Sequence, residues 1–304
     1  MVTALVGSNK FAMKRRLDER ASAFVSKYGD LALEKIDVQE SDAQSILDSI
    51  QSMPFLSEKK MVILRDLGSN KQAAEQIEQI IYAAGSTTEV VIYETSIDKR
   101  TGYFKTLKEK TSLEEHSSLD GRELASWLVE EAKAQGAQLS IGDAFTLIDR
   151  IGSDQVRLFN ELNKLITYQP KITLNSIELL TDQTPHSRVF DLLDAAFSGD
   201  KKRALELYEE QRAQKVEPQA IMAMITWQLH LLAVVKYAGD KPLNSIADDM
   251  NMKSFPISKA AGLAVRLGED KLKNLINDAF IIDWKTKTTP LDLDESIRNY
   301  IVTI

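Results

Sequence analysis

The chain has 304 residues, of which 43% are hydrophobic and 27% are charged. This balance is typical of globular proteins and excludes a wholly disordered or low-complexity chain. Cysteine is absent, so disulfides, cysteine-ligated metal sites and thiol nucleophiles are excluded, and a reducing compartment is favoured. The three histidines lie far apart in sequence, and we therefore expect no metal site. The net charge is −7 and no segment is basic, which disfavours strong autonomous binding to duplex DNA.

The first 118 residues alternate predicted strands and helices. Asp42 is the expected N-cap of one helix, and Pro54 ends it because proline disfavours helical geometry in the residue before it. Strands that alternate with helices indicate a parallel sheet with crossover helices. The predicted strands are Thr3–Gly7, Leu31–Val38, Lys60–Leu67 and Glu89–Thr95.

Strand patterns stop near residue 118, and helical patterns fill the rest of the chain. The sequence Asp120-Gly-Arg-Glu123 resembles a capping box, which opens the first of these helices. The hydrophobic residues that follow recur at helical spacing. The further predicted helices are Ile141–Ile151, Gln155–Tyr168, Leu174–Leu180, Val189–Phe197, Lys201–Gln214, Pro218–Tyr237, Pro256–Leu267, Lys271–Trp284 and Leu291–Ile304.

The chain divides at two points. The change from alternating strands to helices gives the first boundary, and a Thr-Asp-Gln-Thr-Pro sequence ending at Pro185 gives the second. We therefore predict an α/β domain over residues 1–118, a small helical domain over residues 119–184 and a larger helical domain over residues 185–304. No internal repeat stands out, so a solenoid is not favoured.

One uncharged stretch approaches the length of a membrane span. It covers Pro218–Val235 and contains Gln219, Thr226, Gln228 and His230, so we interpret it as a core helix that is apolar on most faces. The apolar run at the start of the sequence is too short for a signal peptide. We expect a cytoplasmic protein without membrane contact.

The turn after the first predicted strand is where a phosphate-binding loop would lie. In a Walker A motif beginning at Gly7, the next fixed positions would be glycine, lysine and serine or threonine, but this chain has Ala12, Met13 and Lys14 there. No apolar strand ends in the acidic pair of a Walker B motif. Two interpretations remain open: a P-loop-like fold without its nucleotide site, or an unrelated α/β domain. In both, we expect no ATP hydrolysis, no bound cofactor and no catalytic residues.

The segment QSMPFLSEKK, residues 51–60, holds Phe55 and Leu56 between a proline and a polar run. Consecutive residues of an irregular segment point in different directions, so burying both in their own domain is difficult. Such a pair suits insertion into a pocket on another protein, where each side chain would contribute roughly 1.5–3 kcal/mol. The alternative is that Phe55 covers the end of the sheet as part of the core.

Four stretches of the chain carry a resemblance to a known family. They are Met53–Arg65, Val189–Leu207, Glu217-Pro218 with the helix to Lys236, and Asp278–Leu291. Their order and spacing resemble the delta subunit of the bacterial DNA polymerase III clamp loader, over essentially all 304 residues. No single stretch is highly specific. The sequence Lys287-Thr288-Thr289 departs from the glycine that is usual in the family's last turn.

The resemblance implies an AAA+-like parallel-sheet domain that lacks a P-loop signature, followed by a small helical lid domain and a helical collar domain that joins the other loader subunits. It also implies that Phe55 and Leu56, supported by Gln51, Met53 and Pro54, enter a hydrophobic pocket of the ring-shaped sliding clamp. Access to the clamp would then depend on ATP bound to neighbouring subunits.

The implied function is a non-catalytic subunit that binds the sliding clamp (the beta subunit) and opens its ring for loading onto primed DNA. The implied partners are the clamp, the loader's motor and delta-prime subunits, and primer–template DNA within the assembled loader, at the replisome in the cytoplasm. The alternative is a nucleotide-dependent enzyme of P-loop-like fold with a degenerate phosphate loop. The motor ATPase and the delta-prime stator both fit poorly, because the cysteine-rich zinc module of those subunits cannot form here.

Overall fold

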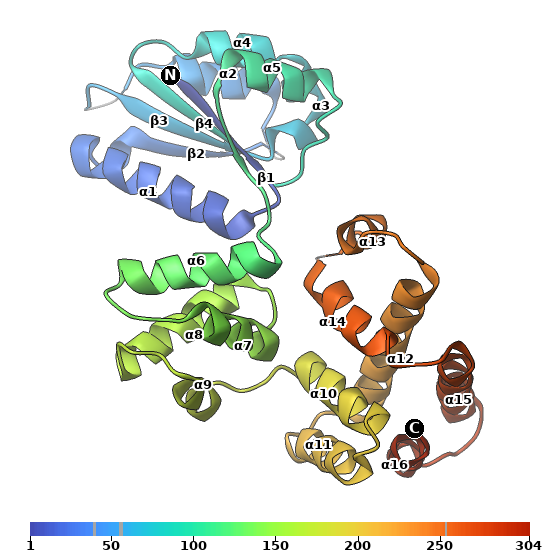
Figure 1. Ribbon diagram of the computed structural model, residues 1–304. Helices are drawn as coiled ribbons and strands as arrows, with labels where there is room; N and C mark the ends of the chain where they lie inside the picture. Colours follow the sequence, from blue (N-terminus) through green and yellow to red (C-terminus); the bar gives the residue numbers. More distant parts are fainter. Residues whose placement is uncertain (39–40, 55–56, 253) are drawn as a thin grey trace. The chain divides into compact units, whose positions relative to one another are not determined.

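The computed structural model describes residues 1–38, 41–54, 57–252 and 254–304 (Figure 1). The chain forms two compact units, residues 1–119 and 120–304. The first unit ends within one residue of the predicted α/β domain. The division of the second unit into a lid over residues 119–184 and a collar over residues 185–304 stays a prediction.

The first unit is built on a five-stranded sheet in which every neighbouring pair is parallel. The predicted α/β fold class is therefore confirmed. The strand order is β2-β3-β4-β1-β5, so β1 lies inside the sheet and the last strand pairs with its outer side. The strands are β1 (Val2–Gly7), β2 (Leu33–Asp37), β3 (Lys60–Arg65), β4 (Thr88–Glu94) and β5 (Ser112–His116).

Helices cover both faces of this sheet. On one face, α1 packs Met13, Leu17 and Phe24 against the sheet. The other face is covered by the remaining helices, because the chain crosses the sheet in the opposite direction after β2 and right-handed crossovers then change face (Figure 1). The helices are α1 (Lys10–Tyr28), α2 (Ala43–Gln51), α3 (Lys71–Glu75), α4 (Ile77–Ala83) and α5 (Gly102–Lys110).

Two predicted features of this unit differ in detail. The strand predicted over Leu31–Val38 is shorter, because Asp30–Ala32 forms a 3-10 turn before β2. The edge strand β5 was not predicted from the sequence: its residues are Ser-Leu-Glu-Glu-His, which lack the apolar run of a buried strand. The predicted N-cap is confirmed, since the Asp42 carboxylate accepts a hydrogen bond of 2.6 Å from Ser45 N.

Over its described residues, 120–252 and 254–304, the second unit is helical apart from one isolated bridge between Gln138 and Lys171. Its helix starts follow the sequence closely because side chains cap them, as Ser140 and Asp154 do. A short helix after Pro242, α13, was not predicted. The helices are α6 (Gly121–Ala134), α7 (Ile141–Ile151), α8 (Gln155–Tyr168), α9 (Leu174–Leu180), α10 (Pro185–Phe197), α11 (Lys201–Ala213), α12 (Pro218–Tyr237), α13 (Leu243–Asp249), α14 (Ser254–Ala264), α15 (Glu269–Thr288) and α16 (Leu293–Thr303).

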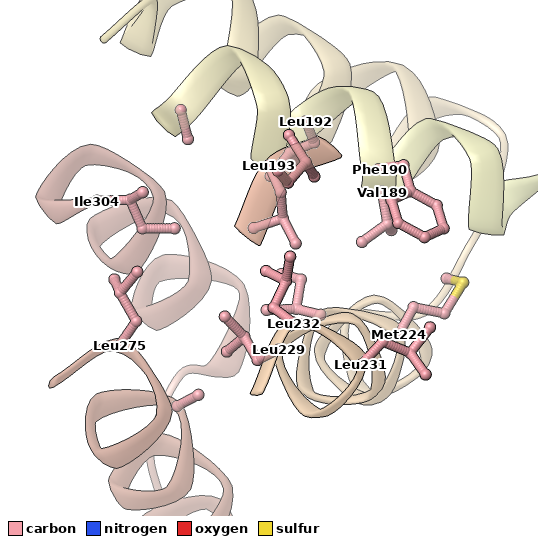
Figure 2. Packing of buried hydrophobic residues seen from close by; sticks show 14 of the residues in the cluster. Val189, Phe190, Leu192, Leu193, Met224, Leu229, Leu231, Leu232, Leu275 and Ile304 are labelled. Atoms are coloured by element: carbon pink, nitrogen blue, oxygen red, sulfur yellow. The ribbon is translucent and has the colours of Figure 1, made fainter. Parts of the chain in front are cut away.

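The uncharged stretch forms α12, the central helix of the larger hydrophobic cluster of this unit. By length and composition α12 could cross a membrane, and 44% of its most apolar 18-residue window is buried inside the protein. Leu229, Leu231 and Leu232 are almost completely buried. Figure 2 shows that side chains of α10, including Leu193, point toward those of α12. The helix thus packs against α10, α14, α15 and α16.

Candidate functional site

The predicted partner-binding segment lies at the amino edge of the sheet. It connects the end of α2 to the start of β3, and all five strands run in the same direction. The opposite, carboxyl edge holds Gly7 at the end of β1, where a phosphate loop would lie. The two candidate functions read from the sequence therefore belong to opposite edges of one sheet.

The described part of this segment is largely open to solvent. Gln51 is exposed, the Met53 side chain is 86% exposed, and Pro54 is half-buried. Phe55 and Leu56, the two residues predicted to insert into a partner, lie outside the described residues. A large apolar side chain as exposed as Met53 has little of its surface packed within its own fold.

The carbonyl groups at the end of α2 are bound by donors from the chain beyond it. Ser52 N donates to Asp48 O over 2.9 Å, which closes the last helical turn. Lys60 Nζ donates to Ser49 O, and Thr88 Oγ1 donates to Ile50 O over 3.1 Å. Ser52 Oγ also donates to Ser49 O over 3.0 Å, so the carbonyls of Ser49 and Ile50 at the end of α2 are capped by Ser52 and by side chains of β3 and β4.

Lys60 is a buried cation at the end of the segment, where β3 begins. It is 6% exposed, and its Nζ also donates to Ser52 Oγ over 2.7 Å and lies 3.9 Å from Glu34 Oε2. Burial lowers the pKa of the ammonium, and the Glu34 carboxylate opposes that shift. The negative end of the α2 dipole also favours a cation at this place.

Sequence reasoning assigned no role to Lys60 beyond the first position of a buried strand. The signal that could have found it is a charged residue at the start of an otherwise apolar run, Lys60-Met-Val-Ile-Leu. Its partners in the last turn of α2 and at the C-cap of that helix lie 11 and 8 residues earlier in the chain, in contacts that only the tertiary fold creates.

At the carboxyl edge, only Ser8 and Asn9 connect β1 to α1. Asn9 N donates to His116 O over 3.0 Å, and Asn9 Nδ2 donates to Ser117 O over 3.2 Å. Asn9 Oδ1 accepts from Ala12 N over 3.0 Å and so caps α1. These bonds direct the polar groups of the connection toward the chain itself.

Gly7 is required by the packing of two strands. Its φ is +136°, and a Cβ placed on it would lie 2.0 Å from the carbonyl oxygen of His116. Of the residues at the other Walker A places, Met13 is fully buried against the sheet and Lys14 Nζ pairs with Asp18 Oδ2 at 2.7 Å. The glycine that suggested a phosphate loop thus permits the close approach of β1 to β5.

The acidic groups at the carboxyl edge bind neighbouring protein groups. Asp66, in the left-handed region with φ +50°, accepts from Thr95 N and Thr95 Oγ1 at 3.0 and 2.9 Å. Glu94 is 1% exposed and accepts from Tyr103 OH at 2.5 Å and Gly68 N at 2.9 Å. Burial raises the pKa of Glu94, and burial together with the Glu94 charge raises the pKa of Tyr103.

A cavity of about 580 Å³ lies beside Glu94 and Tyr103, between α3, α4 and α5. Its other lining groups include Lys71 and three further acidic residues. Across the described ranges, no group of three or more histidine, aspartate or glutamate side chains is placed to hold a metal ion. The cavity therefore has an acidic lining and no grouping of metal ligands.

A partly exposed ion cluster connects the edge strand β5 to α1. Glu114 accepts from Arg16 Nε over 2.8 Å and from Arg20 Nη2 over 2.6 Å. The two guanidinium groups hold the pKa of Glu114 at about 2, although partial burial acts in the opposite direction. The cluster fixes the strand whose carbonyl contacts Gly7 and Asn9.

A second charged group joins helices of the second unit. Lys259 Nζ of α14 lies 2.6 Å from Asp149 Oδ1 of α7 and 3.8 Å from Asp191 Oδ1 of α10. Asp191 Oδ2 also accepts from Gln183 Nε2 over 2.8 Å, and burial raises the pKa of Asp191 while Lys259 lowers it.

The Asp120 carboxylate, which caps α6, accepts from Phe255 N of α14 over 3.1 Å. None of these contacts was predicted from the sequence.

Comparisons with known proteins point to a single family. The model of the family "DNA polymerase III, delta subunit" matches residues 4–116, and the model of the "DNA polymerase III delta subunit, C-terminal domain" matches residues 186–304. The chain is similar to DNA polymerase III subunit delta of Bacillus subtilis (strain 168), with 23% identity across 96% of this chain and 89% of that protein. The solved structure of the Bacillus subtilis DNA clamp loader delta protein covers 99% of this chain and 94% of its own, with a TM-score of 0.77 and 21% identity, so the two share a fold.

Proposed function

This chain belongs to the family of DNA polymerase III delta subunits, and from that premise we propose that it binds the sliding clamp and opens its ring. The binding groups in this proposal are Phe55 and Leu56, with Gln51, Met53 and Pro54 beside them. Binding would hold one interface of the clamp open so that primed DNA can pass through.

The observation that supports this proposal is the exposure of Met53 on a segment whose two ends are anchored to the sheet. Met53 is 86% exposed and lies two residues before Phe55 in the sequence, so its side chain is open to contact with a partner that the segment binds. Desolvating a phenylalanine or leucine side chain in a pocket contributes roughly 1.5–3 kcal/mol. Two such anchors are enough to dominate the affinity of a protein–protein contact.

The carboxyl edge supports the view that this subunit does not hydrolyse ATP. A Walker A loop needs backbone N–H groups free to surround the phosphates, but the connection Ser8–Asn9 has two residues, and the backbone N–H and side-chain amide of Asn9 both donate to the chain. ATP-dependent control would come from the loader's motor subunits, with delta-prime and primer–template DNA completing the assembly in the cytoplasm. The alternative of a nucleotide-dependent enzyme is disfavoured on the same grounds.

The direct test measures the affinity of the full chain for the sliding clamp of the same organism. We expect Phe55→Ala together with Leu56→Ala to weaken binding by more than a hundredfold, since the two side chains together contribute about 3–6 kcal/mol. The matched control is Leu31→Ala together with Tyr82→Ala, which removes two apolar side chains that are 77% and 73% exposed elsewhere on the same unit. Equal affinity of the wild type and the Phe55/Leu56 variant would contradict the assignment.

A further inference from the structure

The seven residues 53–59 are connected at both ends to a single buried side chain. Lys60 begins β3 and so ends the segment, while its Nζ donates to Ser52 Oγ over 2.7 Å at the start of the segment. The same Nζ donates to Ser49 O in the last turn of α2. The Lys60 side chain therefore connects the residue that follows the segment, Lys60 itself, to Ser52, the residue that precedes it.

Thr88 extends this connection to the next strand. It is the cross-strand neighbour of Lys60 in the pairing of β3 with β4, and it is 3% exposed. Its Oγ1 donates to Ile50 O over 3.1 Å, and Lys60 N donates to Thr87 O over 2.9 Å. The end of α2 is thus bound to the amino ends of two central strands.

Together, Lys60 and Thr88 hold the carbonyls at which α2 ends and the hydroxyl at which the segment begins. Fixing the ends of a loop reduces the number of conformations that must be lost when the loop binds a partner. An ammonium is a strong donor for this purpose, since hydrogen bonds that involve a charged group are stronger than neutral ones.

We infer that Lys60 is a positioning residue for the clamp-binding segment: it closes the base of residues 53–59 by bonding to Ser49 and Ser52, and Thr88 supports it from β4. The inference rests on the proposed function, because it concerns how the segment that carries Phe55 and Leu56 is presented. Lys60 itself is buried and makes no contact with the clamp in this account.

The test compares Lys60→Met, which keeps the length of the side chain but removes its donors, with Lys60→Arg, which keeps a cation. We expect Lys60→Met to weaken clamp binding roughly tenfold, because a segment whose ends are no longer fixed must be ordered when it binds. Lys60→Arg should recover part of that loss. Thr88→Val should weaken clamp binding less, because it removes the hydrogen bond to Ile50 O but keeps the hydrogen bonds of Lys60 to Ser49 and Ser52.

A structural control separates positioning from general destabilisation. Met13→Ala removes a fully buried side chain on the opposite face of the sheet, and it should lower the melting temperature without reducing clamp affinity in the folded protein. Because the chain has no cysteine, Glu58→Cys introduces a single thiol for a nitroxide label at an exposed place in the segment. In the absence of clamp, the label should be more mobile in Lys60→Met than in Lys60→Arg or Met13→Ala.

The outcomes distinguish the two proposals. If Phe55→Ala with Leu56→Ala leaves clamp affinity unchanged, the proposed function is wrong. If that variant loses affinity while folded Lys60→Met binds as the wild type does, with an unchanged label spectrum, the positioning role is wrong and the proposed function stands. Loss of affinity in Lys60→Met with an increase in label mobility supports the inference.

Discussion

The Glu114 carboxylate lies between two arginines of α1 and attaches the edge strand to that helix. The pKa of Glu114 is lowered to about 2, so the folded state favours the ionised form more than the unfolded state does. The resulting stability is fully present above about pH 4.5 and is lost as the pH falls toward 2. Strand β5 is therefore held more weakly in acid.

We expect Glu114→Gln to lower the free energy of unfolding at pH 7 by about 1–2 kcal/mol, a value that allows for solvent screening of the partly exposed arginines. Urea denaturation followed by circular dichroism at pH 7, 5 and 3 measures the difference from the wild type. The difference should shrink between pH 5 and pH 3, because the Glu114 carboxyl of the unfolded chain takes up a proton there while the folded one, with a pKa of about 2, stays largely ionised. A difference that stays constant across this range would show that the ion pairs contribute little.

At the scale of elements, the almost uncharged helix α12 lies within the hydrophobic core of the second unit. Leu229 is 1% exposed, and the cluster around it includes side chains from α10, α15 and α16 (Figure 2). Replacing such a residue removes buried methyl groups and leaves a cavity that neighbouring helices fill only in part. The helix thus carries much of the stability of the second unit.

We expect Leu229→Ala to destabilise the second unit by about 2–5 kcal/mol. The three tryptophans all lie in this unit, and Trp227 is on α12 itself, so urea denaturation followed by tryptophan fluorescence reports on it. Val265→Ala is the matched surface control, because Val265 is 83% exposed and its loss should change the stability by no more than about 0.5 kcal/mol. Equal stability of the two variants would be inconsistent with a core role for α12.

The elements that the sequence predicts well are those with local signals. Helices such as Ile141–Ile151 have a capping side chain at the start and an apolar face at helical spacing, and their bounds agree with the structure. Strand β5 was missed because it is a partly exposed edge strand whose Glu114 and Glu115 are stabilised by cations elsewhere in the fold. The short α13 lacks a comparable cap.

The candidate site was predictable only in part, for a physical reason. The apolar pair Phe55–Leu56 and the defective Walker positions are properties of the sequence itself. The role of Lys60 depends on the end of α2, and the role of Gly7 depends on the carbonyl of His116, more than a hundred residues away. Contacts of this kind arise from the sheet order and leave no local pattern.

At the scale of the whole molecule, the two edges of the sheet have different roles in this account. The amino edge exposes Met53, and polar groups at the carboxyl edge form internal bonds. We expect that titration of the full chain with ATP and Mg²⁺, followed by isothermal calorimetry, shows no saturable binding at up to millimolar nucleotide. Saturable, Mg²⁺-dependent binding would favour the alternative of a nucleotide-dependent enzyme.

Opening of the clamp by this chain without nucleotide tests the role of Phe55 and Leu56 most directly. A donor and an acceptor fluorophore are placed on the two sides of one clamp interface, and the energy transfer between them is followed as the full chain is added without ATP. We predict a saturable fall in transfer with the wild-type chain and no fall with the variant that carries Phe55→Ala and Leu56→Ala. A clamp that stays closed with the wild type, or that opens equally with the variant, would contradict the account.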